Sequence, residues 1–536
     1  MRAVPGNLEV VSDVRAPALL PGEVCRPVLD IEGNGDLARV CDDAEHLLLK
    51  VGAAIYQRGG VLVRIVREAA DQPGLKRDVS APRIVPFDDL SLCDVITRHI
   101  EVRKRNRKTQ DLVCVDCPRV VAQTILARKE WRFRYLEALV EHPVVLEDGR
   151  VLWESGYHAE SGILLDIEPF TFQSPYDDPD KDYAQEHLAR LCELLGGFAF
   201  VDKLDLSVAL AFLLTPFVRP LLQTAPAFAF DAHAAGSGKS TLVRTGAVMS
   251  TGREPAFLTY GDDPVELEKL LFAALLAGDQ QIAMDNVIGS VRGAVLAVIL
   301  TSAIYRGRVL GQSATATVPT KAVISMNGNN LQIVGDLTRR TLVCRIDPEC
   351  ERPAEREFAF DPVEEVRSMR SEYVLHALTI MQAYIASGDC VQLRPFGSFE
   401  AWSRLVREPL VWLGLPDPVD SIRVLEAADP EREQLRAMLT SVESVFERRE
   451  FKATEAIHAS QARRQAELGG GPVPSDDQRE ALAEALQAVC ERNGELNSKA
   501  LGRWLLGMQG RIEGGMRFVR IREARGGAMW RIERKV

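Results

Sequence analysis

The chain of 536 residues lacks a long uninterrupted apolar run. Its most apolar stretch, residues 204–222, is interrupted by Pro216 and Arg219, so it predicts a buried helix and not a membrane span. The N-terminus lacks the basic and then apolar pattern of a secretory signal. The ten cysteines follow no paired framework, as is typical of proteins from a reducing compartment. We therefore expect a soluble, cytoplasmic protein with no membrane partner.

The net charge argues against a surface that binds nucleic acid throughout. A net charge of −11 and an isoelectric point near 5.5 do not suit a protein that binds nucleic acid over its whole surface. Positive charge is nevertheless concentrated near the C-terminus, which is the local pattern of a DNA-binding module, although a solvated or protein-docking face is the alternative. The basic residues there are Lys499, Arg503, Arg511, Arg517, Arg520, Arg522, Arg525, Arg531, Arg534 and Lys535.

A glycine-rich segment lies between an apolar run and a helical pattern. Residues 227–241 read AFAFDAHAAGSGKST, which predicts a strand, a phosphate loop and a helix. The two glycines allow backbone N–H groups to face an anion, and Lys239 would reach the β- and γ-phosphates of ATP. His233 stands where the common pattern has its first glycine. The expected ATP-binding residues are His233, Ala234, Ala235, Gly236, Ser237, Gly238, Lys239, Ser240 and Thr241, with the Ser240 hydroxyl also binding Mg²⁺.

An acidic residue ends a second apolar run. Residues 282–285 read Ile-Ala-Met-Asp, so Asp285 is placed to hold Mg²⁺ beside the phosphate loop. Many hydrolysing proteins have Glu directly after this Asp, whereas this chain has Asn286. The catalytic base is therefore open, with Asp285 itself or Glu254 as candidates. A simple strand-capping turn is the structural alternative.

Two more features follow along the chain. The apolar run 323–326 ends in Asn-Gly-Asn-Asn, where an amide can sense the γ-phosphate or place a water; we favour Asn329, with Asn327 as the alternate. Arg339 and Arg340 then precede a last apolar run. Ring ATPases place an arginine finger there, and a solvated arginine pair is the alternative.

These motifs, in this order and spacing, resemble the AAA+ module of superfamily 3 helicases, in particular the helicase parts of phage, prophage and plasmid primase-helicases. The segments 56–60, 156–157 and 397–403 resemble that group too. The resemblance implies ATP and Mg²⁺ as cofactors and a hexameric ring that moves on single-stranded or forked DNA, with an origin duplex as a further partner. It also implies a finger, Arg340 or Arg339, that acts on the neighbouring subunit, and a lid arginine, Arg407, that contacts ATP.

In that family a hairpin before the sensor strand enters the central pore. Residues 308–318 suit a hairpin here, and Arg308 and Lys321 are the expected DNA contacts, with a purely structural hairpin as the alternative. The C-terminal helices 478–492 and 498–508, followed by strands 518–521 and 529–532, suggest a winged helix. Within it we expect Lys499, Arg503, Arg517 and Arg520 to contact DNA.

Strands expected at 227–231, 256–259, 281–286, 323–326 and 341–347 alternate with helices, which predicts an α/β fold with a parallel sheet. Breaks in composition predict seven segments. They are an N-terminal arm (1–30), an α+β collar or oligomerisation domain (31–168), a linker (169–182), an AAA+ ATPase domain (183–362), an α-helical lid (363–460), a second linker (461–475) and the winged helix (476–536).

The sequence leaves two rival functions open. An AAA+ remodeller of proteins would share the motor, and a slow or non-hydrolysing nucleotide-switched DNA-binding initiator would suit Asn286. Primer synthesis is not expected, because the N-terminal region has the isolated Asp116 where a metal-dependent polymerase needs clustered carboxylates. The interpretation that we favour is an ATP-driven DNA helicase of a mobile element.

Overall fold

The computed structural model describes residues 26–534 except 32–35, 68–80, 107, 169–170, 173–175, 177–178, 262, 310–314, 357–358, 428–429, 462–473, 493 and 525–526. Most of the expected arm, part of the first linker and most of the second therefore lie outside the described residues. The chain forms two compact units, Met1–Leu331 with Arg339–Ile422, and Gln332–Thr338 with Arg423–Val536. Within the residues described, no helix is long and apolar enough to cross a membrane.

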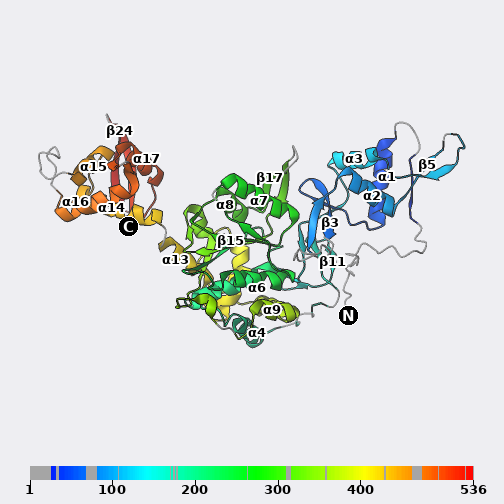
Figure 1. Ribbon diagram of the computed structural model, residues 1–536, viewed down its shortest axis with the longest axis horizontal. Helices are drawn as coiled ribbons and strands as arrows, with labels where there is room; N and C mark the ends of the chain where they lie inside the picture. The colour runs from blue at the N-terminus through cyan, green and yellow to red at the C-terminus, as the bar shows by residue number, and fades with distance from the viewer. Residues whose placement is uncertain are drawn as a thin grey trace. The chain divides into compact units, whose positions relative to one another are not determined.

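A parallel five-stranded sheet forms the centre of the first unit (Figure 1). Its strands, in spatial order, are β14 (Phe257–Thr259), β15 (Gln281–Val287), β19 (Val323–Asn329), β13 (Ala227–Ala232) and β21 (Thr341–Arg345). Strands buried on both faces need continuous apolar runs, as in the Phe228 and Phe230 segment, which is fully buried. The predicted α/β class and parallel sheet are confirmed. Because the strands are parallel, their carboxyl ends meet at one edge, where a ligand site is expected.

Helices surround this sheet, and most of them, though not α7 or α8, contribute to its core. Buried side chains of the helical segment after residue 362 belong to that core as far as Ile422. The helices are α4 (Lys181–Leu194), α5 (Lys203–Leu214), α6 (Lys239–Thr251), α7 (Pro264–Ala277), α8 (Ala294–Thr301), α9 (Pro362–Ser368), α10 (Arg370–Ser387), α11 (Glu400–Trp402) and α12 (Glu408–Trp412), with short 3-10 helices at Thr215–Phe217, Pro353–Glu355 and Pro418–Ser421 and a π-helix at Ser403–Arg407.

The N-terminal region has two parts that belong to different cores. Helices α1 (Leu37–Lys50), α2 (Asp89–His99) and α3 (Arg119–Arg128) pack into a core of their own. By contrast, Ala138, Val140, Ile163 and Leu165 join the core of the central five-stranded sheet, so no single N-terminal core extends to residue 168 as we expected. The strands are β1 (Val28–Asp30), β2 (Tyr56–Arg58), β3 (Val61–Arg67), β4 (Pro82–Pro86), β5 (Glu101–Arg105), β6 (Leu112–Cys114), β7 (Arg134–Tyr135), β8 (Ala138–Val140), β9 (Val144–Val145), β10 (Val151–Leu152), β11 (Gly156–His158) and β12 (Ile163–Leu165).

The second unit contains the predicted helix, helix and hairpin, together with three helices that we expected in the lid. Leu435, Met438, Leu439 and Val442 of α14 are buried in one core with Trp530, so the lid does not extend to residue 460. Their spacing makes one apolar stripe on the helix. The elements are α13 (Ile422–Ala427), α14 (Pro430–Phe446), α15 (Ala453–Gln461), α16 (Asp476–Cys490), β22 (Glu491–Arg492), β23 (Glu495–Leu496), α17 (Ser498–Met508), β24 (Met516–Ala524) and β25 (Gly527–Arg534).

Candidate nucleotide site

The phosphate loop connects β13 to α6 at the carboxyl edge of the sheet. Gly236 and Gly238 have φ of 76° and 104°, in the left-handed region that favours glycine. Gly238 is the N-cap of α6, and a Cβ atom there would lie 3.3 Å from the ring of Phe198. Both positions therefore require glycine, and the loop brings the positive end of the α6 dipole to the site.

Lys239 begins α6 and is buried. Its Nζ donates hydrogen bonds to Ala234 O at 3.1 Å, Ser237 Oγ at 3.0 Å and Asn329 Oδ1 at 2.8 Å. Burial lowers the pKa of Lys239. The cation thus lies between the loop and the end of β19, where phosphate oxygens could replace its protein acceptors.

Three side chains meet next to it. Asn327 Nδ2 donates to Asp285 Oδ1 at 2.6 Å and to Ser240 Oγ at 2.9 Å, and Ser240 Oγ donates to Asp285 Oδ1 at 3.2 Å. Asn327 is only 1% exposed, and its Oδ1 has no hydrogen-bond partner among the described residues. Hydroxyl, carboxylate and amide oxygens are ligands that Mg²⁺ accepts, so this set fits that ion.

Asn286, next to Asp285, has a structural reason to be asparagine. Its φ is 51°, β15 is irregular between Met284 and Val287, and its N–H donates to Asp285 Oδ1 at 2.8 Å. Asparagine tolerates the left-handed region better than other non-glycine residues. The residue therefore shapes the bulge that presents Asp285.

Glu254, the other candidate base, is held by arginines. Its carboxylate accepts bonds from Arg244 Nε at 2.8 Å and NH2 at 2.6 Å, and Arg367 lies 3.5 Å away. The hydrogen bonds from Arg244 are the main cause of its lowered pKa. A carboxylate stabilised in this way is a poor proton acceptor, so the structure argues against Glu254 as the base.

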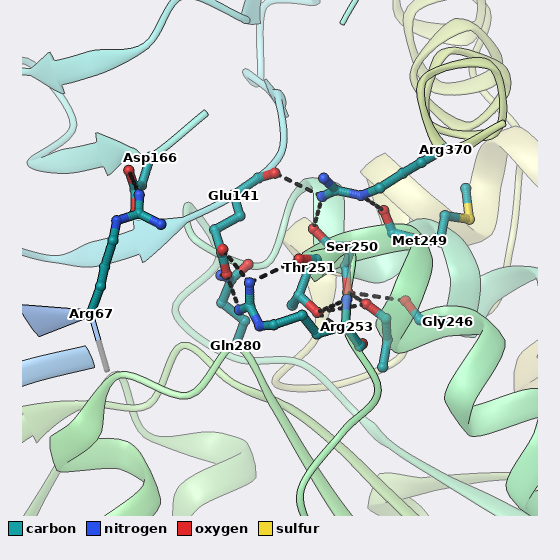
Figure 2. A network of polar contacts seen from close by, with 11 residues as sticks. Arg67, Glu141, Asp166, Gly246, Met249, Ser250, Thr251, Arg253, Gln280 and Arg370 are labelled. Atoms are coloured by element: carbon teal, nitrogen blue, oxygen red, sulfur yellow. Dashed lines mark hydrogen bonds and ion pairs between the residues drawn. The ribbon is translucent and has the colours of Figure 1, made fainter. Parts of the chain in front are cut away.

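The last turn of α6, the helix that follows the phosphate loop, is fixed by a buried polar network (Figure 2). Arg370 donates to Met249 O at 3.1 Å, Ser250 O at 2.6 Å and Glu141 O at 2.7 Å. Glu141 also forms a two-bond ion pair with Arg253. A cation at a helix C-terminus is stabilising. Arg370 begins α10, so its side chain links the end of α6 to α10 and to Glu141, which follows β8.

His233 lies in the phosphate loop, whereas Arg340 contacts α8. The exposed His233 has its Nδ1 2.9 Å from Asn330 Oδ1. Arg340 donates to Ala297 O and, at 3.1 Å, to Thr301 Oγ1 at the C-terminus of α8. Arg339 is the more exposed of the two arginines.

Arg407 does not have the environment that we expected. It is 2% exposed and forms an ion pair with Asp417, with Nε to Oδ1 at 2.7 Å, while its NH1 donates to Arg394 O at 2.8 Å. The expectation that Arg407 contacts ATP is therefore wrong in this structure. The side chain lies in a π-helical turn and stabilises the helical region around it.

A cavity of about 790 Å³ adjoins the phosphate loop. Ser237, Gly238 and Thr241 line it on the loop side, and the aromatic rings of Phe198 and Phe360 line it elsewhere. Sequence reasoning missed both rings, because residues distant in the chain carry no local signal of a shared cavity. The volume suits a nucleoside-sized ligand.

Of the two DNA contacts expected at the pore hairpin, one side chain is exposed and the other turns inward. Strands β17 (Ile304–Arg308) and β18 (Thr315–Pro319) pair antiparallel, Arg308 is exposed, and the tip at 310–314 lies outside the described residues. Lys321 instead turns inward, with its Nζ donating to Leu222 O at 3.0 Å, and burial lowers its pKa to about 8. The expectation for Lys321 is therefore wrong.

Of the four DNA contacts expected in the C-terminal unit, two side chains are exposed on a helix and two form ion pairs. Lys499 and Arg503 are exposed, four residues apart on α17, which places them on one face of the helix. Arg517 pairs with Glu533 at 2.9 Å and Arg520 pairs with Glu523. Carboxylates thus partly neutralise the hairpin arginines.

Comparisons with known proteins give structural matches but no match in sequence. No protein-family model matches the chain, and no curated protein has a similar sequence. Two apo structures of the NrS-1 C-terminal region are similar, one with a TM-score of 0.41, 10% identity and coverage of 91% of this chain and 98% of that one. The other has 0.35, 12%, 83% and 99%. A JCV helicase structure has a TM-score of 0.21, 16% identity and coverage of 43% and 66%.

Proposed function

We propose that this protein hydrolyses ATP and uses the energy to move along DNA, as a helicase of a phage, prophage or plasmid-like element. The observation that supports this most is the cluster of Lys239, Ser240, Asp285, Asn327 and Asn329 at the carboxyl edge of a parallel sheet. A lysine on a phosphate loop, a hydroxyl and a strand-end carboxylate are the parts that phosphoryl transfer needs.

Each side chain has a role in this proposal. Ser240 and Asp285 would hold Mg²⁺, which neutralises charge that develops on the phosphates. Lys239 would exchange its bond to Asn329 for one to the γ-phosphate, which frees that amide to orient a water. Asn327 fixes Ser240 and Asp285 relative to each other. Asp285 is our candidate for the base, since Glu254 is held by arginines. The cavity beside Phe198 would take the nucleoside.

A second candidate has specific support. The absence of Glu after Asp285 favours a slow, nucleotide-switched DNA-binding initiator. Phosphate release measured with and without saturating forked DNA separates the two. A helicase shows turnover that DNA stimulates several-fold, while turnover that stays near background with DNA bound would support the initiator and contradict our proposal.

We also propose that the C-terminal unit binds duplex DNA through Lys499 and Arg503. Because α14 shares its core, we expect a fragment that starts at Arg423 to fold and one that starts at Pro472 to remain unfolded by circular dichroism. DNA binding by the longer fragment should weaken steeply with salt, since contacts to phosphates release counterions.

Replacing both Lys499 and Arg503 by alanine should reduce the slope of log K against log salt by about two, at ~0.9 for each phosphate contact. Arg517→Ala is the matched control, because this arginine is paired with Glu533. If Arg517→Ala weakens DNA binding more than the double variant does, the DNA lies on the β24–β25 hairpin.

A further inference from the structure

A cavity of about 20 Å³ lies where the N-terminal strands join the ATPase core. Arg58, Arg219 and Lys321 line it, each from a different part of the first unit: Arg58 ends β2, Arg219 follows α5, and Lys321 follows β18. His142 lines it too, but burial lowers the pKa of this imidazole to about 4. The volume is close to that which one water-sized particle needs. A tetrahedral oxyanion would not fit.

The two arginines are deeply buried and bind backbone carbonyls. Arg58 is 3% exposed and donates to Glu137 O at 2.8 Å and Leu275 O at 3.2 Å, while its Nε has no partner among the described residues. Arg219 is 2% exposed and donates to Ala322 O at 3.0 Å and to two other carbonyls. Carbonyl dipoles solvate these cations but do not neutralise them.

Lys321 adds a third positive charge. Burial is the main cause of its lowered pKa, and the charges of Arg219 and Arg58 lower that pKa further. Glu137 and Asp279 also line the cavity, yet among the described residues neither forms an ion pair with these cations. The charge of Glu137 raises the pKa of both Arg58 and Lys321, so this carboxylate offsets part of the positive charge. The cluster still holds more cations than carboxylates, and buried charge that is not fully offset is costly.

We propose that this cavity binds a monatomic anion, chloride in the cell, between the Arg58 guanidinium and the Lys321 ammonium. The anion supplies the missing counter-charge, and it occupies the space beside the unpartnered Nε of Arg58. Because Arg58 belongs to the N-terminal strands and Lys321 to the ATPase region, the anion also strengthens the joint between them. The inference does not depend on the nucleotide site.

Thermal unfolding of the full chain in chloride or in gluconate, at equal ionic strength, tests this. Binding to the folded state raises the melting temperature, and we expect a difference of about 2–5 °C in favour of chloride. Lys321→Met should remove this difference. Lys269→Met changes an exposed lysine and should keep it, which controls for general salt effects. Glu137→Gln should enlarge it, because the variant removes a competing carboxylate.

A direct measurement keeps the proposal testable if Lys321→Met does not fold. Crystals of the wild-type protein grown with bromide should show an anomalous peak in the cavity beside Arg58 and Lys321. An empty or water-filled cavity at high bromide, together with the same chloride effect in all variants, would overturn the proposal. The Glu137 carboxylate would then be the counter-charge.

Discussion

We expect Lys239→Ala to lower ATP turnover by ~10³-fold or more, because under the proposed function it removes the cation that would contact the transferred phosphate. In the present structure this ammonium is the one that joins the phosphate loop to Asn329. Turnover measured by phosphate release at saturating ATP and Mg²⁺ gives the result. Lys269→Ala, at an exposed position on α7, is the matched control and keeps full turnover.

The fold should survive this substitution. Burial lowers the pKa of Lys239, which means that the folded protein holds this cation at a cost. Removing it relieves this cost but also removes three hydrogen bonds, so we expect the melting temperature to change little. Wild-type turnover in a folded Lys239→Ala protein would show that the phosphate loop is not the hydrolytic site, and it would remove the basis of the proposed function.

The sequence predicted the strands and the helix that surround the candidate site. Each central strand contains an apolar run that a polar residue follows, so the position of the strand and the direction of its carboxyl end are both visible in the chain. The phosphate loop is likewise local, because two glycines and the start of a helix define it. Asp285 and Asn329 could be named for the same reason.

Features that depend on distant contacts could not be predicted. Helical periodicity shows that α14 has an apolar stripe, but it does not show whether the stripe faces the lid or α16. The predicted C-terminal boundary of the lid at residue 460 is therefore too late in the chain. Arg407 is buried and Lys321 is half-buried in the fold, where Asp417 and Leu222 O are their partners. Nothing in a single sequence pairs such residues.

Arg339→Ala should leave ATP binding unchanged and reduce hydrolysis by ~10³-fold, if this arginine serves the phosphate loop of a neighbouring subunit in a ring. We choose Arg339 over Arg340 because it is the more exposed. Arg340 is bonded to the C-terminus of α8 in its own chain, so Arg340→Ala should mainly lower the melting temperature.

Mixing variants tests whether the finger acts between subunits. In equal mixtures of Arg339→Ala and Lys239→Ala chains, about a quarter of the interfaces of a ring combine an intact phosphate loop with an intact finger. Hydrolysis should therefore recover well above that of either variant alone. Native mass spectrometry confirms that the rings are mixed and gives the number of subunits, for which we propose six. If mixed rings show no recovery of hydrolysis, the finger does not act in trans. If Arg340→Ala abolishes hydrolysis without loss of stability, Arg340 is the finger and Arg339 is not.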